Sequence, residues 1–284
     1  MIQLVEKDEN TTRTYVQQLK QRCDEKDRKV DAIVADILEN VRNNGDKAVA
    51  EYTLKFDGSI PEQVEITKEQ MKELIKQCDA YFLEALERAA KNIHEFHSRQ
   101  KQQSWLDTKD NGVILGQRVR GLAKVGIYVP GGTAAYPSSV LMNAIPAKIA
   151  GVQEIVMVTP PGKDGKPNPD IMAAALVAGV DRVFLVGGAQ AVAALAYGTE
   201  TMPKVDKIVG PGNIFVATAK KHLYGTVDID MIAGPSEILI VADETANPKY
   251  LAADLMSQAE HDVLASAILL TTSSKIAEET IAQI

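Results

Sequence analysis

The segment Val183-Phe184-Leu185-Val186-Gly187-Gly188-Ala189-Gln190 shows the pattern that decides the fold. Four apolar residues, typical of a buried strand, lead into a glycine pair and then into the alanine-rich stretch 189–196, which is typical of a helix. The same order of strand, turn and helix recurs on both sides of this segment. Because alternating strands and helices build parallel sheets with helical crossovers, the pattern predicts an α/β fold.

Short β-rich runs and helical stretches alternate through the middle and the end of the chain. We expect strands at 125–129, 155–159, 183–186, 207–209, 238–242 and 267–271, and helices at 138–150, 170–178, 189–196, 213–223 and 250–260. The expected strands are continuously apolar, as in sheets that are covered on both faces. Ligands of such sheets bind beyond the carboxyl ends of the strands, so we expect the chemistry in the loops there.

Residues 1–110 differ from this middle region in composition. They carry 18 Lys/Arg and 22 Asp/Glu but only two of the 19 glycines, and their apolar residues recur at helical spacing. We expect helices over 30–41, 46–56 and 68–100. Gly45 is placed to end the first of them, and Thr67 to cap the last. A strand-like patch at 113–119 predicts a hairpin.

Composition and charge exclude several classes of protein. The 284 residues carry a formal charge of −7, which gives no overall attraction to nucleic acid or to anionic lipid. No apolar run approaches the ~20 residues that cross a bilayer, and the start lacks the features of a secretion signal. Cys23 and Cys78 have no close-spaced partner. We therefore expect a cytoplasmic protein of one large or two modest domains, with no nucleic-acid or membrane partner.

Five loops carry residues that are suited to hold a ligand. They are Tyr128–Thr133, Val186–Gln190, Gly210–Asn213, Ala233–Glu237 and Ser257–Asp262. Glycines let the backbone approach a ligand closely, and free amides at a helix N-terminus attract anions such as phosphate. Each loop alone is weak support, because Gly-Gly and Gly-Pro are common turn sequences. Neither GxGxxG nor GxxxxGK[ST] occurs, so the usual dinucleotide and P-loop fingerprints are absent.

The side chains that could bind metal or attack a substrate are few. Gln258 and His261 are three residues apart, share one helix face and can both ligate zinc, but from spacing alone a polar helix end with a dipole-stabilised histidine is the preferred interpretation. The run Lys220-Lys221-His222 is likewise typical of cations near a helix end. No cysteine follows Cys78 and GxSxG is lacking, which argues against thiolate and serine-hydrolase chemistry.

The five loops taken together, in this order and spacing, resemble the histidinol dehydrogenase family. The motifs are Tyr-Val-Pro-Gly-Gly, Val-Gly-Gly-Ala-Gln-Ala, Gly-Pro-Gly-Asn, Ala-Gly-Pro-Ser-Glu and Ser-Gln-Ala-Glu-His. The resemblance implies oxidation of L-histidinol to L-histidine through histidinaldehyde, with two NAD⁺ and a zinc ion. It also implies a homodimer with exchanged segments. The implied fold has two incomplete Rossmann-like parallel-sheet domains preceded by N-terminal helices.

The resemblance also assigns roles to individual residues. The positions that match NAD-binding residues of the family are Tyr128, Gln190 and Asn213. Ser236 matches a substrate-contacting serine, and Gln258 and His261 match two zinc ligands that also face the substrate. The family's catalytic Glu-His pair and its remaining zinc ligands correspond to positions beyond Ile284. We therefore expect no catalytic residue among these 284 and no turnover from them alone.

From the resemblance we expect an N-terminal helical segment, 1–25, and two α/β domains. The first, discontinuous domain takes 26–127 plus 236–284, and the second takes 128–235. Two alternatives stay open. One is a relative of the aldehyde dehydrogenases, which share NAD⁺ and a sheet architecture, although the missing loop cysteine counts against it. The other is a non-catalytic chain that only binds a ligand or dimerises.

Overall fold

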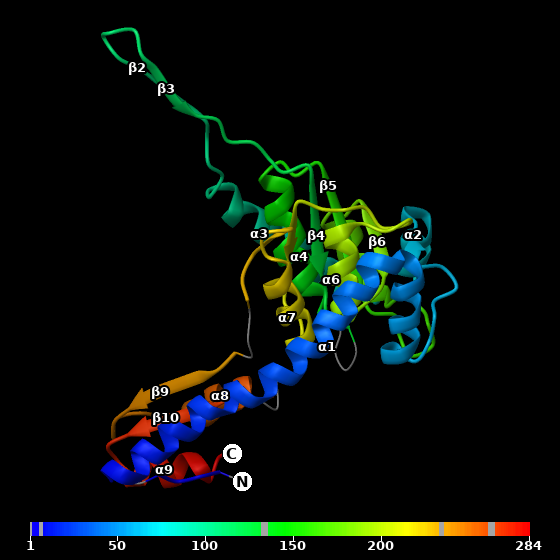
Figure 1. Cartoon of the computed structure of the whole chain (residues 1–284). Helices are drawn as coiled ribbons and strands as arrows, with labels where there is room; N and C mark the ends of the chain where they lie inside the picture. The colour runs from blue at the N-terminus through cyan, green and yellow to red at the C-terminus, as the bar shows by residue number, and fades with distance from the viewer. Residues whose placement is uncertain (1, 6–7, 132–135, 233–235, 261–264) are drawn as a thin grey trace. The chain divides into compact units, whose positions relative to one another are not determined.

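The computed structural model describes residues 2–5, 8–131, 136–232, 236–260 and 265–284 (Figure 1). It contains two compact units. The smaller unit combines Met1–Glu25 with Ala233–Ile284, and the larger unit is Lys26–Ile232. The sequence-based division grouped 26–127 with 236–284, and the structure divides the chain differently. The reason is that strand β4 (Lys124–Tyr128) lies in the middle of the sheet of the larger unit, so the residues before and after it pack against the same sheet.

The larger unit is built on a six-stranded sheet with the order β1-β6-β5-β4-β7-β8. The other five strands are β1 (Glu65–Ile66), β5 (Glu154–Thr159), β6 (Arg182–Leu185), β7 (Lys207–Val209) and β8 (Asp228–Ile229). All neighbours pair in parallel except β1, which runs antiparallel to β6. The predicted α/β class is thus confirmed. The chain builds outward from β4 in one direction and then in the other, so the topology reverses between β4 and β7.

Helices cover both faces of this sheet (Figure 1). They are the part of α1 (Glu9–Asp57) that belongs to the larger unit, together with α2 (Lys68–Ile75), α3 (Ala80–Ser98), α4 (Pro137–Ile149), α5 (Pro169–Val177), α6 (Gly188–Tyr197) and α7 (Ile214–Leu223). One core contains residues of α1, α6 and α7, and the other contains residues of α2 to α5. Side chains alternate along each strand, so Ile127 enters the second core and Tyr128 the first. Tyr128 therefore points to the face that carries α6 and α7.

Helix α1 is interrupted at Gly45. This glycine has φ 51° and ψ −133°, which are not helical, so the element consists of two helices that meet there. The carboxylate of Glu200 accepts a hydrogen bond from the Asp46 N–H at 2.9 Å, and Thr201 donates to the Asp46 side chain at 3.1 Å. A loop that follows α6 thus binds the start of the second helix. The predicted stop at Gly45 is confirmed.

The single helix predicted over 68–100 is wrong, because a cap divides it. Asp79 accepts hydrogen bonds from the N–H groups of Tyr81 and Phe82 and starts α3 as a new helix. The predicted cap at Thr67 is confirmed. Its hydroxyl accepts from the Gln70 N–H at 3.2 Å, while the Gln70 side chain accepts from the Thr67 N–H at 2.8 Å.

Two small strand pairs complete the description. The predicted hairpin is present, as β2 (Trp105–Thr108) and β3 (Ile114–Gln117), and all its strand residues are exposed. In the smaller unit β9 (Ile238–Ala242) and β10 (Ala267–Thr271) pair in parallel with the predicted bounds, and α8 (Pro248–Ala259) and α9 (Ser274–Ile281) contact them. Within the described residues, no helix combines the length and apolar character that a membrane span requires.

Candidate functional site

The carboxyl edge of the six-stranded sheet brings together three of the predicted loops. Tyr128 ends β4, the Gly187–Gly188 pair follows β6, and Gly210 follows β7. These strands are parallel, so their carboxyl ends lie at the same edge. The reversal of topology between β4 and β7 lies at this edge, and such a reversal opens the crevice where open α/β sheets bind ligands.

Tyr128 joins the end of β4 to the start of α6. Its side chain is 3% exposed, and its hydroxyl accepts a hydrogen bond from the Gly188 N–H at 3.0 Å. Burial raises the pKa of Tyr128 to about 12; the nearby charge of Asp57 adds to this rise, and the hydrogen bond from Gly188 opposes it. The phenol therefore keeps its proton at neutral pH and can donate it to an acceptor.

Gln190 is a buried amide without a partner. It lies in the first turn of α6 and is 1% exposed, and within the described part of the chain neither its Nε2 nor its Oε1 has a hydrogen-bond partner. Gly188 makes this placement possible, because a Cβ there would lie 2.6 Å from Gln190 Oε1. An unpartnered buried amide costs free energy, which a ligand with a matching donor and acceptor would recover. The predicted cofactor position thus fits a polar ligand such as a nucleotide.

Asn213 has a structural role in addition to its predicted one. It is the N-cap of α7, and its Oδ1 accepts from the N–H groups of Phe215 and Val216 at 3.1 and 3.2 Å. Because its Oδ1 already accepts from two amides of the first turn, the Nδ2 group is the part of this side chain that remains for a ligand. A cofactor contact of Asn213 stays a prediction.

Asp57, at the end of α1, was not predicted from the sequence. Its Oδ2 is buried and has no hydrogen-bond partner among the described residues, and burial raises the pKa of its carboxyl group. Its charge acts on Tyr128. In the sequence the pair Asp57-Gly58 has the character of an ordinary turn, and no local pattern distinguishes it.

The remaining predicted residues belong to the smaller unit. Ser236 is exposed just before β9, and His261 lies outside the described residues. Gln258, near the end of α8, has a buried Oε1 with no hydrogen-bond partner in the described part of the chain. A buried amide oxygen that lacks a donor fits a cation such as zinc. The described residues contain no cluster of three or more His, Cys, Asp or Glu side chains that could bind a metal.

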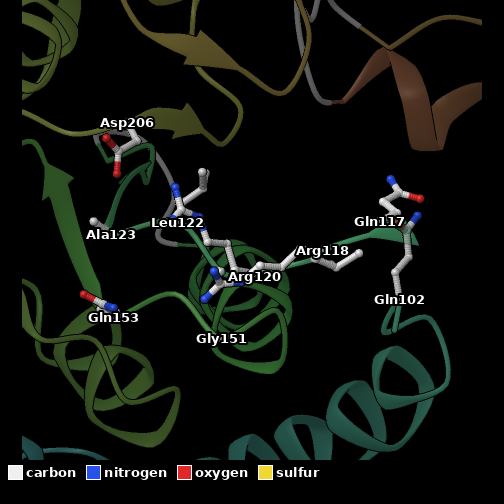
Figure 2. Close-up of a pocket in the computed structure, with 11 residues that line it drawn as sticks. Gln102, Gln117, Arg118, Arg120, Leu122, Ala123, Gly151, Gln153 and Asp206 are labelled. Atoms are coloured by element: carbon white, nitrogen blue, oxygen red, sulfur yellow. The ribbon is translucent and has the colours of Figure 1, made fainter. Parts of the chain in front are cut away.

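A cavity of about 840 Å³ lies at the opposite, amino edge of the sheet (Figure 2). Its lining includes Ala123, Gln153 and Asp206, which directly precede β4, β5 and β7, together with the exposed Arg118 and Arg120. None of the predicted site residues lines it. A smaller cavity of about 160 Å³ lies beside the carboxyl end of β6, where Leu185 and Val186 contribute to an apolar lining.

Comparisons with known proteins agree on one family. The family profile described as histidinol dehydrogenase matches residues 20–284. The histidinol dehydrogenase of Clostridium acetobutylicum is 60% identical over 270 residues, which are 95% of this chain and 63% of that protein. The enzyme of Listeria innocua is 60% identical over 244 residues, or 86% and 57% of the two chains.

A solved structure gives the same result. The crystal structure of histidinol dehydrogenase from Elizabethkingia anophelis matches with a TM-score of 0.81 and 41% identity, over 89% of this chain and 58% of that one. This chain therefore spans less than two thirds of the length of the relatives that it matches. The chain belongs to the histidinol dehydrogenase family.

Proposed function

We propose that the complete protein oxidises L-histidinol to L-histidine through histidinaldehyde, with NAD⁺ as the oxidant and a zinc ion in the site. Family membership supports the reaction class. The observation that carries the cofactor assignment is the unpartnered amide of Gln190, which is buried in the first turn of α6 beside the Gly188–Tyr128 hydrogen bond. A donor and an acceptor held together at the carboxyl edge of a parallel sheet suit a dinucleotide.

Three residues of the larger unit would hold NAD⁺. Gln190 would exchange one donor and one acceptor bond with it, and Tyr128 would present a neutral O–H. The helix dipoles at the N-termini of α6 and α7, the second capped by Asn213, favour the negative charge of a pyrophosphate. When bound, NAD⁺ supplies the hydride acceptor. Conversion of an alcohol to a carboxylate removes two hydrides, so one histidinol and one water consume two NAD⁺ and release two NADH and three protons.

Residues of the smaller unit would bind the metal and the substrate. We propose Gln258 and His261 as zinc ligands and Ser236 as a substrate contact, and the unpartnered Gln258 Oε1 supports this assignment. When bound, zinc supplies a Lewis acid that does not change its redox state. From the family resemblance, we expect the Glu-His base outside these 284 residues. We therefore expect them alone to hold zinc poorly and to give no turnover with L-histidinol and NAD⁺.

We further propose that the complete protein is a cytoplasmic homodimer, as its family resemblance implies. The formal charge of −7 supports the absence of a nucleic-acid or anionic-membrane partner. Analytical ultracentrifugation of the 284-residue chain and of a chain with the relatives' full length would test the oligomeric state. A full-length monomer with full turnover would contradict the proposal.

The cofactor site can be tested on the 284-residue chain through NADH fluorescence. Gln190→Ala removes two unpartnered buried atoms, so we expect an unchanged or higher thermal midpoint. We expect the same change to weaken NADH binding by about 1–3 kcal/mol, or roughly 5- to 150-fold, because two ligand bonds are lost. Gln153→Ala at the amino edge is the matched control and should leave the affinity unchanged. Equal affinity of Gln190→Ala and the wild type would contradict the cofactor assignment.

The reaction needs a second measurement. A chain extended to the relatives' full length should oxidise L-histidinol with release of two NADH per histidine, and a chelator should abolish this activity. Gln258→Ala in the extended chain should lose zinc, as measured by metal analysis after dialysis, while it keeps its fold by circular dichroism. A full-length chain that binds NADH but gives no turnover would favour the non-catalytic alternative.

A further inference from the structure

An ion pair between a buried lysine and a partly exposed aspartate holds the backbone of Gly210, the first residue after β7. Lys220 of α7 is 2% exposed, and its ammonium group donates to the Gly210 carbonyl at 3.0 Å and pairs with Asp230. Asp230 accepts from the Gly210 N–H at 2.8 Å and from the Met231 N–H at 2.7 Å. Two charged side chains thus bind both polar groups of one glycine.

Gly210 in turn lies against the end of β4. Its φ of +112° is a conformation that side chains rarely adopt, and a Cβ there would lie 2.2 Å from the Tyr128 carbonyl oxygen. This contact is at the point where the topology reverses between β4 and β7. Three residues later the same loop reaches Asn213, the N-cap of α7. The loop therefore links two of the residues proposed to hold the cofactor.

Such a pair is a poor source of net stability, because the charge of the buried Lys220 must first lose its hydration. Its value lies in geometry, since charge-assisted hydrogen bonds are short and directional. Lys220 reaches back from the last turn of α7 to the loop that starts this helix. The pair thereby fixes the N-terminus of α7 relative to β4 through four hydrogen bonds around Gly210 and Met231.

We propose that Lys220 and Asp230 are positioning residues for the cofactor site. They hold the Gly210–Asn213 loop so that Tyr128 and the N-terminus of α7 can contact the same dinucleotide. Neither Lys220 nor Asp230 contacts the dinucleotide itself. This inference rests on the proposed function, because it assumes NAD(H) at the carboxyl edge. It predicts both that the ion pair holds the loop in place and that loss of the pair weakens the binding of NADH.

The test uses the 284-residue chain with the double change Lys220→Met and Asp230→Asn. Removal of both charges leaves no unpaired ion, so the variant should fold. We expect its NADH dissociation constant to rise at least tenfold, and we expect the Gly210 amide to exchange hydrogen at least tenfold faster. The matched control is Lys207→Met with Asp228→Asn, which removes an exposed lysine–aspartate pair from β7 and β8. It should change neither quantity by more than twofold.

The outcomes separate the two proposals. A folded double variant with wild-type affinity overturns the positioning role, and so does a loss of affinity without faster exchange at Gly210. A wild-type chain that binds no NADH at millimolar concentration contradicts the proposed cofactor site instead, and the exchange rates then decide whether the pair holds the loop. If the double variant fails to fold, Asp230→Asn alone is measured in the same way, with the same criteria.

Discussion

The two edges of the six-stranded sheet differ in how their polar groups are used. At the amino edge, carboxylates that precede the strands bind the strand N–H groups: Asp181 accepts from Ile155 and Asp206 from Lys124, at 2.8 and 2.9 Å. At the carboxyl edge, Gln190 and Asp57 keep buried atoms without partners in the described part of the chain. These carboxylates of the amino edge are thus used within the fold, whereas the two side chains at the carboxyl edge keep polar atoms that could bind a ligand.

The largest expected loss of stability comes from a substitution that tests how tightly the carboxyl edge is packed. Gly210→Ala combines an unfavourable φ with a collision against the Tyr128 backbone, and we expect a loss of roughly 2–6 kcal/mol of unfolding free energy in urea. Gly225→Ala is the matched control, because Gly225 has a φ of +98° but open space around its Cβ position. It should cost only about 1–3 kcal/mol, from strain alone. Equal losses would show that the close approach to Tyr128 carries no cost.

The next largest effect is the loss of unfolding free energy when the lysine is removed from a lysine–aspartate pair at either edge. Lys220→Met leaves Asp230 without its cation, and we expect a loss of about 3 kcal/mol, at the low end for a buried pair because Asp230 is 30% exposed. Lys207→Met, at the amino ends of β7 and β8, should cost less than about 1 kcal/mol, as solvent screens that pair. Urea unfolding of both variants measures the difference. A loss at Lys207 as large as that at Lys220 would remove the distinction between the edges.

The carboxyl edge should also be sensitive to alkali. Tyr128 has a folded pKa of about 12, above the value near 10 of an unfolded chain, so its stabilising effect is complete below pH 10 and is lost as the pH rises through 12. Between pH 9 and pH 11 this amounts to about 1.4 kcal/mol. Tyr128→Phe should remove this part of the pH dependence in urea unfolding. Identical profiles of variant and wild type over this range would refute it.

The smallest expected effect is a change of stability at acidic pH, caused by a residue of the amino edge. A hydrogen bond from Lys207 lowers the pKa of Asp228, so its contribution is present above the unfolded value of about 3.9 and is lost as the pH falls below it. Asp228→Asn should therefore flatten the acid side of the stability profile slightly, without affecting the alkaline side. A change on the alkaline side would mean that the two edges are coupled.

The sequence predicts what is local in the chain. The strands at 207–209, 238–242 and 267–271 have the predicted bounds, because apolar runs between turn residues identify them. The helix over 68–100 was predicted as one, because its apolar spacing continues across the cap at Asp79. The two-residue strands β1 and β8 were not predicted, since they exist only through pairing with distant strands.

The residues of the candidate site likewise differ in whether the local sequence predicts them. Glycine-rich turns and family motifs identify Tyr128, Gln190 and Asn213, but nothing nearby in the sequence marks Asp57. The run Lys220-Lys221-His222 has the pattern of exposed cations, yet Lys220 is buried and His222 pairs with Asp31, 191 residues earlier in the chain, at 2.8 Å. Such roles depend on which distant residue completes a pair, and helix-end propensity carries no information about that.

The break in α1 has a consequence for how the chain is made. The helix that restarts at Asp46 receives its N-terminal acceptor from Glu200, a residue 154 positions later. During synthesis this acceptor is still absent when the helix leaves the ribosome, and it arrives only after α6 has been translated. The native hydrogen bond at the start of the second part of α1 can therefore form only after most of the larger unit has been synthesised.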